Sequence, residues 1–216
     1  SQPSNVYHKI SIIDGWYEYQ LTDKFEKIFA KRIVLKYQDI LADTYKYKST
    51  DSIIKIVKLI KDNKNTFFKT NQKSELFKKY TINDIMIIAS LVEKEGTDDN
   101  DKRIISSIIF NRLEKNMKLQ IDASTIFAIT KGKFKYDRKL NLNDLKIQDD
   151  YNTYYINGLP PTPICYISKK TINIILENYK SEYLFYFYNK KIKKHVYSKT
   201  YNQHKIKLKK YRDNEK

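Results

Sequence analysis

The sequence is poor in cysteine and has no long apolar run. One of its 216 residues is a cysteine, Cys165, so the chain forms no internal disulfide and no metal site built on several cysteines. No segment approaches the roughly 18 consecutive apolar residues that a membrane-spanning helix requires. The chain does not begin with a signal peptide, and it contains no internal repeat or low-complexity tract. We therefore expect a globular chain, with any anchoring or targeting segment lying upstream of it.

Positive charge is abundant instead. The chain has 42 Lys and Arg against 25 Asp and Glu, which gives a formal net charge of +17. Clustered lysines would favour nucleic-acid binding, but these are mostly dispersed and accompany abundant Ile, Asn and Tyr, which indicates a general compositional bias. We therefore predict no nucleic-acid partner. Attraction to other polyanions, such as acidic cell-wall polymers or a lipid surface, fits the same charge.

Apolar spacing predicts an α+β fold with small antiparallel β elements. The expected elements are a strand at residues 8–14, helices at 15–34, 52–63, 82–95, 102–115 and 168–179, a hairpin with its turn near 189–191, and a terminal helix. The proline-rich residues 158–164 exclude continuous helix in the preceding segment. We place a boundary near residue 75, between a small N-terminal α/β subdomain (1–75) and a larger domain (76–216).

The stretch ASLVEKEG, residues 89–96, ends an apolar helix with two glutamates. At about 100° per residue, Asn83, Ser90 and Lys94 form one polar stripe, which we expect to face solvent. Glu93 and Glu95 each lie about 100° from Lys94, on the two shoulders of the buried surface. A carboxyl group that loses solvent there has a raised pKa, as a general acid needs. The alternative is that both glutamates form surface salt bridges with some of the many lysines and arginines.

The two glutamates cannot act on one bond together. Glycosidases that use two carboxylates hold them about 5 to 10 Å apart across one glycosidic bond, whereas side chains two residues apart on a helix diverge by about 200°. If one glutamate is catalytic, the other is therefore supporting or structural. A second carboxylate must come from elsewhere, and Asp122 is the nearest candidate in the sequence.

Four ordered motifs resemble one enzyme family. ASLVEKEG is followed by RIISSIIFNRLEKNMKLQIDASTIFAI, then by YNTYYINGLPPTPI, and last by YLFYFYNKKIKKHVYSKTYNQH. Upstream, ISIIDGWYEYQLTDKF and ILADTY are similar to further elements of the same family. Together they resemble the catalytic domain of the endolytic murein transglycosylases, the MltG or YceG-like family. The resemblance implies a YceG-like catalytic domain at residues 76–216. It also implies an upstream membrane helix and most of a LysM-like segment outside this chain.

The resemblance assigns chemistry to particular residues. Glu95 is implied as the catalytic acid that protonates the glycosidic oxygen between N-acetylmuramic acid and N-acetylglucosamine, and then as the base toward the C6 hydroxyl, giving a 1,6-anhydro end. No cofactor and no metal are implied. The implied substrate-binding or supporting residues are Glu93, Gln120, Asp122, Tyr151, Asn152 and Thr153. Asn152 is expected to read an acetamido group in the glycan cleft, and His195 and His204 are expected to make structural hydrogen bonds.

The implied setting is the cell wall. We expect a single-pass protein of the cytoplasmic membrane with its catalytic domain on the extracytoplasmic or periplasmic side, acting on peptidoglycan glycan strands, with cell-wall synthases as candidate partners. Two alternatives stay open from the sequence. One is a noncatalytic glycan-binding or scaffold module in which Glu95 only forms a salt bridge. The other is a hydrolase that admits water and leaves reducing ends.

Overall fold

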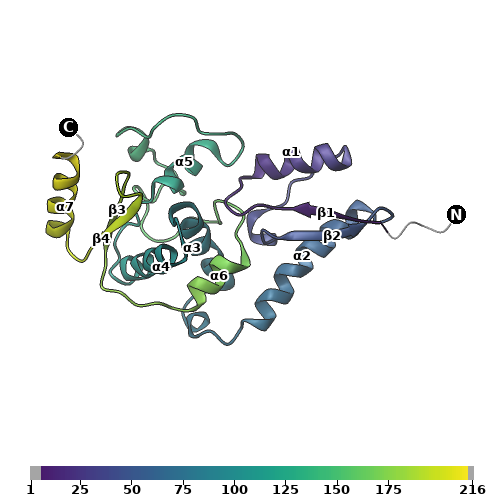
Figure 1. The fold of residues 1–216 in the computed structure, drawn as a ribbon, viewed down its shortest axis with the longest axis horizontal. Helices are drawn as coiled ribbons and strands as arrows, with labels where there is room; N and C mark the ends of the chain where they lie inside the picture. The colour runs from purple at the N-terminus through teal and green to yellow at the C-terminus, as the bar shows by residue number, and fades with distance from the viewer. Residues whose placement is uncertain (1–5, 214–216) are drawn as a thin grey trace.

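The computed structural model describes residues 6–213 as seven α-helices and two separate two-stranded sheets (Figure 1). This confirms the predicted α+β class. The elements in chain order are β1 (Tyr7–Ser11), α1 (Glu18–Phe29), β2 (Thr44–Lys48), α2 (Ile53–Thr70), α3 (Ile82–Glu95), α4 (Asp99–Glu114), α5 (Asp122–Thr130), α6 (Lys169–Leu176), β3 (Phe185–Asn189), β4 (Lys194–Ser198) and α7 (Tyr201–Asp213).

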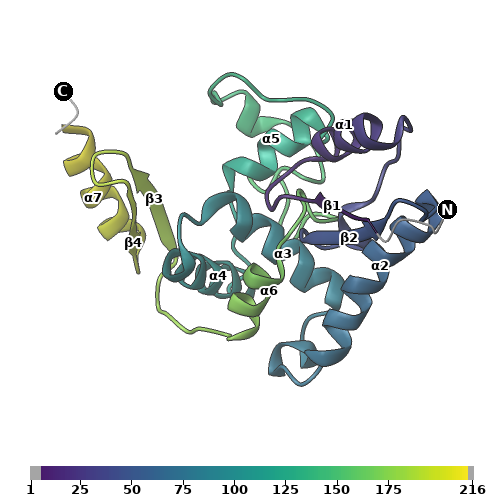
Figure 2. The ribbon, with the colours of Figure 1, turned by 45° about the vertical axis from the view of Figure 1, so that its right-hand side comes forward.

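The N-terminal part is a two-stranded sheet with a helix on either side. Strands β1 and β2 pair antiparallel, with Tyr7 opposite Lys48 and Ser11 opposite Thr44. Figures 1 and 2 show this sheet between α1 and α2. The segment before α6 packs against this N-terminal part, where the Tyr166 hydroxyl donates to the carbonyl of Leu35 at 2.6 Å. The proposed boundary near residue 75 stays a prediction.

Helix α3 runs through the middle of the molecule (Figure 2) and packs against α4, α5 and α6. Every residue from 85 to 92 is buried, as expected for a helix that is surrounded on all sides. The predicted polar stripe is therefore wrong at Ser90, which is fully buried. Its hydroxyl donates to the carbonyl of Ile87 at 2.7 Å and accepts from the amide of Ile164 at 3.0 Å.

The C-terminal hairpin and α7 lie at the opposite end of the long axis from the N-terminal sheet (Figure 1). Strands β3 and β4 pair antiparallel, with Phe185 opposite Ser198 and Asn189 opposite Lys194. Helix α7 packs on both strands. This hairpin confirms the predicted one, although its turn lies at residues 190–193, slightly later than expected.

Two elements went unpredicted. Strand β2, TYKYK, alternates tyrosine with lysine, a strand signal that the sequence analysis did not use, and the short helix α5 falls between residues 119 and 164, where only continuous helix is excluded. Helix α4 begins at Asp99 rather than at residue 102, because the Asp98 side chain accepts from the amide of Asp101 at 2.8 Å and caps it. No helix within residues 6–213 is long and apolar enough to cross a lipid bilayer.

Candidate active site

Helix α3 carries the two glutamates in its last turn, and both ends of the helix are fixed. Thr81 and Asp84 form a capping box at its start, where the Thr81 hydroxyl accepts from the amide of Asp84 at 3.1 Å. At its end, Gly96 lies so close to α4 that an added Cβ would meet Cγ of Lys102 at 2.3 Å. The absence of a side chain at Gly96 therefore lets α4 pack directly against the turn that holds Glu93 and Glu95.

Glu93 is held in a buried ion pair. Its carboxylate accepts from the Lys102 ammonium, and the two side chains are 4% and 14% exposed. The Ser168 hydroxyl, at the start of α6, donates to the same carboxylate at 3.3 Å. Glu93 thus links α3 to α4 and α6. This fits the supporting role, one of the two roles that the resemblance implies for it.

Lys94 does not mark solvent as the helical wheel predicted. Its ammonium donates to the carbonyl of Gly15 at 3.2 Å and lies 4.3 Å from the centre of the Tyr17 ring. The segment before α1 covers this face of α3, so the helix is enclosed and this face does not lie on the surface. The wheel assumed one exposed side, and that assumption fails here.

Glu95 lies in a cavity of about 420 Å³ between α3, α5 and the C-terminal hairpin. Its side chain is half-buried, and the Tyr186 hydroxyl donates to Oε2 at 3.3 Å. The cavity is lined by Glu95, Arg112, Gln120, Asp122, Tyr154, Tyr186, Phe187, Tyr188, His195, Leu208 and Arg212. Three of the sequence-predicted residues, Glu95, Gln120 and Asp122, therefore share one cavity.

The surroundings of Glu95 raise its pKa from 4.5 to about 6. Burial is the largest cause, and the negative charge of Asp122 adds to it, because both disfavour the ionised carboxylate. The charge of His195, the hydroxyl of Tyr186 and the backbone amide of Ala123 act in the opposite direction. The result is a carboxyl group that loses its proton close to neutral pH, as a general acid that later acts as a base requires.

Asp122 opens α5 and is exposed to the cavity. The Tyr154 hydroxyl donates to its Oδ1 at 2.6 Å. Burial, and then Asp122 itself, raises the pKa of Tyr154 above its ordinary value of 10.0, so this hydroxyl keeps its proton and remains a donor. Asp122 is thus an oriented carboxylate on the wall opposite the end of α3.

Replacing Asp122 with asparagine is expected to lower the pKa of Glu95. The substitution removes the negative charge that disfavours ionisation of Glu95 and keeps the size of the side chain. Carbon-13 NMR titration of the Glu95 carboxyl measures the shift. Asp149→Asn is the matched control, because Asp149 pairs with Lys131 away from this cavity and should leave the Glu95 titration unchanged. An unchanged midpoint in Asp122→Asn would mean that the two carboxylates do not interact.

Gln120 is held by its backbone at the rim of the cavity. It adopts a left-handed conformation with φ of 52°, and its amide donates to the carbonyl of Thr153 at 3.1 Å. Its side chain is exposed and lines the cavity. This backbone geometry turns the chain into α5 and brings Gln120 and Asp122 to the same wall.

Asn152 and Thr153 lie behind that wall, and neither lines the cavity. Asn152 is 0% exposed, and its amide nitrogen donates to the carbonyls of Leu145 and Ile147 at 3.0 and 2.8 Å. Its oxygen accepts from the Thr125 hydroxyl at 2.8 Å. The expected contact of Asn152 with an acetamido group is therefore corrected: all of its polar atoms are used within the protein, and it supports the loop beside α5.

Thr153 and Tyr151 belong to the same loop but lie in different surroundings. The buried Thr153 hydroxyl accepts from the amide of Ile121 at 2.8 Å, next to Asp122 in the chain. Tyr151 lines a different hollow, where its hydroxyl lies 2.9 Å from that of Thr162 and Lys131 lies over its ring. The structure therefore does not bring Tyr151 together with Glu95.

Arg112, Tyr154 and Tyr186 are cavity residues that the sequence reasoning missed. Arg112 is buried, and its guanidinium donates to the carbonyls of Leu184 and Leu119, both at 2.7 Å. The tyrosines gave no signal because the chain has 19 of them. Arg112 lies within the motif FNRLEK, and its unusual place among apolar residues was the one available hint.

The two histidines differ in their surroundings. His195 donates from Nδ1 to Asp101 at 2.8 Å, as expected of a structural hydrogen bond, but it also lines the Glu95 cavity. His204 packs against the rings of Phe185 and Phe187, and its Nδ1 has no hydrogen-bond partner within residues 6–213. In the same part of the chain no group of three or more His, Cys, Asp or Glu could hold a metal ion.

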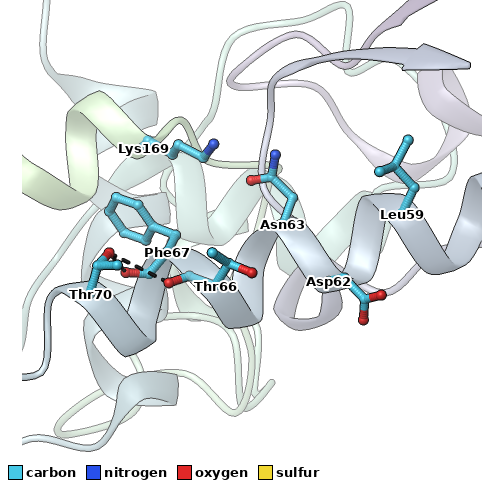
Figure 3. Close-up of a pocket in the computed structure, with 7 residues that line it drawn as sticks. All are labelled: Leu59, Asp62, Asn63, Thr66, Phe67, Thr70 and Lys169. Carbon is cyan, nitrogen blue, oxygen red and sulfur yellow. Dashed lines mark hydrogen bonds between the residues drawn. The ribbon is translucent and has the colours of Figure 1, made fainter.

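A second hollow, of about 450 Å³, lies along α2 beside Lys169 of α6 (Figure 3). Its lining residues are Leu59, Asp62, Asn63, Thr66, Phe67, Thr70 and Lys169. Asp62 points away from Lys169 in this view, so the hollow has no converging acidic groups. The Glu95 cavity is therefore the candidate active site, although the α2 hollow is slightly larger.

Comparison with known proteins agrees with this fold. A family model described as the YceG-like family matches residues 1–210. A protein of Bacillus subtilis (strain 168) named endolytic murein transglycosylase is 36% identical over 170 residues, covering 78% of this chain and 46% of that protein. A protein of the same name from Streptococcus pneumoniae serotype 2 (strain D39 / NCTC 7466) is 34% identical over 112 residues, covering 50% of this chain and 20% of that protein.

A solved structure has the same fold. The crystal structure of a yceG-like protein from Listeria monocytogenes superposes with a TM-score of 0.74 at 24% sequence identity, covering 91% of this chain and 75% of that one. The chain spans less than half the length of the curated relatives described above.

Proposed function

Since the chain belongs to the YceG-like family, we propose that it is an endolytic lytic transglycosylase acting on peptidoglycan. It cleaves the bond between N-acetylmuramic acid and N-acetylglucosamine within glycan strands and leaves 1,6-anhydro-muramoyl ends. The observation that carries this proposal is the placement of Glu95: a half-buried carboxyl group with a pKa of about 6, in a cavity whose other carboxylate comes from a different helix. The two relatives named endolytic murein transglycosylase support the same reaction.

The first step uses Glu95 as an acid. Its proton passes to the glycosidic oxygen as the bond to C1 of the muramoyl residue breaks, and the leaving sugar departs with a new hydroxyl. Glu95 becomes a carboxylate, which the Tyr186 hydroxyl and the Ala123 amide stabilise by hydrogen bonds. Positive charge develops on the muramoyl ring, and the Asp122 carboxylate stabilises that charge from the facing wall.

The second step returns Glu95 to its starting form. The carboxylate accepts the proton of the muramoyl C6 hydroxyl, whose oxygen bonds to C1 and closes the 1,6-anhydro ring. The nucleophile belongs to the substrate, so the enzyme needs no second carboxylate at bonding distance from C1. This agrees with the divergence of Glu93 and Glu95 on α3, where Glu93 is engaged by Lys102.

The remaining polar groups of the cavity have supporting roles in this proposal. Gln120 and Asp122 hydrogen-bond sugar hydroxyl or N-acetyl groups, because both side chains are exposed and line the Glu95 cavity. Asn152 and Thr153 hold that wall in place from behind. Glu93 holds the last turn of α3. Tyr151, in its separate hollow, is left without a role at the reacting bond.

The proposed setting is outside the cytoplasm. Peptidoglycan lies there, and a membrane helix upstream of this chain would hold the domain at the outer face of the cytoplasmic membrane. The net charge of +17 favours contact with acidic wall polymers and lipid head groups. Cell-wall synthases are the proposed protein partners.

Digestion of peptidoglycan tests the reaction. The chain is incubated with uncrosslinked glycan strands and with whole peptidoglycan, and the product ends are identified by mass spectrometry. We expect cleavage within the strands to produce new anhydro-muramoyl ends, each lighter by one water molecule than a reducing end. Reducing ends would instead establish hydrolysis. Binding of strands without any cleavage would favour the scaffold alternative.

A further inference from the structure

Asp101, in the first turn of α4, is a buried carboxylate with several donors around it. It is 4% exposed and accepts from the amide and the hydroxyl of Thr97 at 2.8 and 2.9 Å. Nδ1 of His195 lies 2.8 Å from Oδ2, and the Tyr197 hydroxyl donates to Oδ1. Two of these donors come from β4, so Asp101 links the C-terminal hairpin to α4.

The charge of Asp101 fixes where the proton of His195 lies. Burial alone would raise the pKa of Asp101, but the hydrogen bonds from His195, Tyr197 and Thr97 outweigh it and lower that pKa to about 2. An ionised carboxylate only accepts hydrogen bonds. Nδ1 of His195 therefore carries a proton, and in the neutral ring Nε2 is left with its lone pair.

The ring of His195 separates two hollows. It lines a small one of about 110 Å³ on the Asp101 side and also the 420 Å³ cavity of Glu95. The rings of Tyr186 and Tyr188 hold it edge to face, with centroids 5.3 and 5.2 Å away. The side chain is 5% exposed, and Nε2 makes no hydrogen bond to any residue from 6 to 213. Nε2 is thus a polar atom that is held in place, has no hydrogen-bond partner in the described part of the chain, and belongs to a ring that lines the cavity.

We propose that Nε2 of His195 hydrogen-bonds a hydroxyl group of the glycan in the Glu95 cavity, and that Asp101 is the positioning residue that fixes the tautomer and orientation of the ring. This inference rests on the proposed function for the identity of the ligand. A hydroxyl group suits the site because it donates to the lone pair of the neutral ring and accepts from the protonated ring. A purely structural His195 would need only its Nδ1 bond to Asp101. The two roles therefore predict different cleavage rates for a variant that keeps this bond but lacks Nε2.

The sharpest variant is His195→Asn. The amide nitrogen of asparagine occupies nearly the place of Nδ1 and keeps a donor to Asp101, but asparagine has no atom at the place of Nε2. We expect its cleavage rate to fall about 10- to 100-fold, the loss of one buried hydrogen bond to substrate, while its melting temperature stays close to that of the parent chain. His204→Asn is the matched control and should keep the parent cleavage rate, because His204 itself does not line the cavity and packs behind the ring of Phe187 and against Phe185.

Asp101→Asn tests the positioning role. It removes the charge that keeps the proton on Nδ1, so we expect a loss of cleavage in the same range. The double variant with His195→Asn should fall no further than the single variants, because both act through Nε2. Asp144→Asn is the matched control, a buried carboxylate paired with Arg138 away from the cavity, and it should leave the cleavage rate unchanged.

A binding measurement separates this inference from the proposed function. Nitrogen-15 NMR of the histidine rings is recorded on Glu95→Gln protein with and without peptide-free glycan strands. We expect the Nε2 resonance of His195 to move on saturation and that of His204 to stay. Movement without any cleavage by the parent chain would overturn the transglycosylase proposal and keep this one. If the parent chain cleaves, the Nε2 resonance does not move and His195→Asn is fully active, the inference about His195 would be overturned and the transglycosylase proposal kept.

Discussion

Replacing Glu95 with glutamine is expected to reduce glycan cleavage by about 10³-fold, the usual size of a general acid–base contribution. Glutamine keeps the shape of the side chain and its place beside Tyr186, but it can neither give a proton to the glycosidic oxygen nor take one from the C6 hydroxyl. The rate of appearance of anhydro ends on uncrosslinked strands measures the loss. Strand binding should survive, since the cavity keeps its other polar groups.

The same substitution is expected to stabilise the fold at neutral pH. The folded-state pKa of Glu95, about 6, lies above the ordinary value of 4.5. Below pH 4.5 both states hold the proton and nothing is gained or lost. Between these values the unfolded chain ionises first, so the free energy of unfolding falls by about 2 kcal/mol as pH rises through 6. Glutamine has no charge to lose, so Glu95→Gln should be more stable by about that amount at pH 7.5 and equally stable at pH 4.

Urea unfolding at the two pH values measures this difference. Glu114→Gln is the control for both experiments: Glu114 pairs with Lys79 on the surface, and its loss should change neither cleavage nor the pH dependence of stability. A Glu95→Gln protein that cleaves at the parent rate would remove Glu95 from the reaction. A Glu95→Gln protein with parental stability at pH 7.5 would mean that water reaches this carboxyl freely.

Replacing Lys102 with methionine is expected to lower the free energy of unfolding by about 3 kcal/mol, because it leaves a buried carboxylate without its cation. Lys102 and Glu93 are 14% and 4% exposed, and apart from Lys102 the groups that reach this carboxylate are the hydroxyl and amide of Ser168. Urea unfolding at neutral pH measures the loss. Activity should fall as well, since Glu93 lies two residues before Glu95 in the same helical turn.

The double variant Glu93→Met/Lys102→Met separates charge from packing. With both charges gone and similar volumes in place, most of the lost stability should return. Lys79→Met is the control, because its partner Glu114 is exposed and such pairs contribute little to stability. Equal, small effects of Lys102→Met and Lys79→Met would contradict the burial of the Glu93 pair.

Local sequence signals predicted α3 and its two glutamates well. The capping box at Thr81 and Asp84 and the apolar run that follows are features of neighbouring residues, and the structure has both. The divergence of side chains two apart on a helix also holds, since Glu93 turns to Lys102 and Glu95 turns into the cavity. Which of the two would meet Lys102 depended on α4, and the sequence of α3 alone could not reveal it.

The partners that complete the site were beyond such signals. Tyr186 meets Glu95 across 91 residues of sequence, and His195 meets Asp101 across 94. Nothing in a run of tyrosines marks one of them as a donor to a distant carboxyl. The wheel failed at Ser90 and Lys94 because it assumes one buried side, and Asn152 was expected in a cleft because an amide suits a sugar as well as it suits a backbone loop.

The cavity joins the middle of the chain to its C-terminal hairpin, and this has a consequence for how the protein matures. As the polypeptide emerges from the ribosome, Glu95 appears long before Tyr186 and His195, which help to set its protonation and its contacts. Until β3 and β4 dock, the glutamate lacks its contacts with Tyr186 and His195 and one side of its cavity. Under the proposed function, a partly synthesised chain would therefore lack the complete site, and we expect cleavage only once the hairpin has docked.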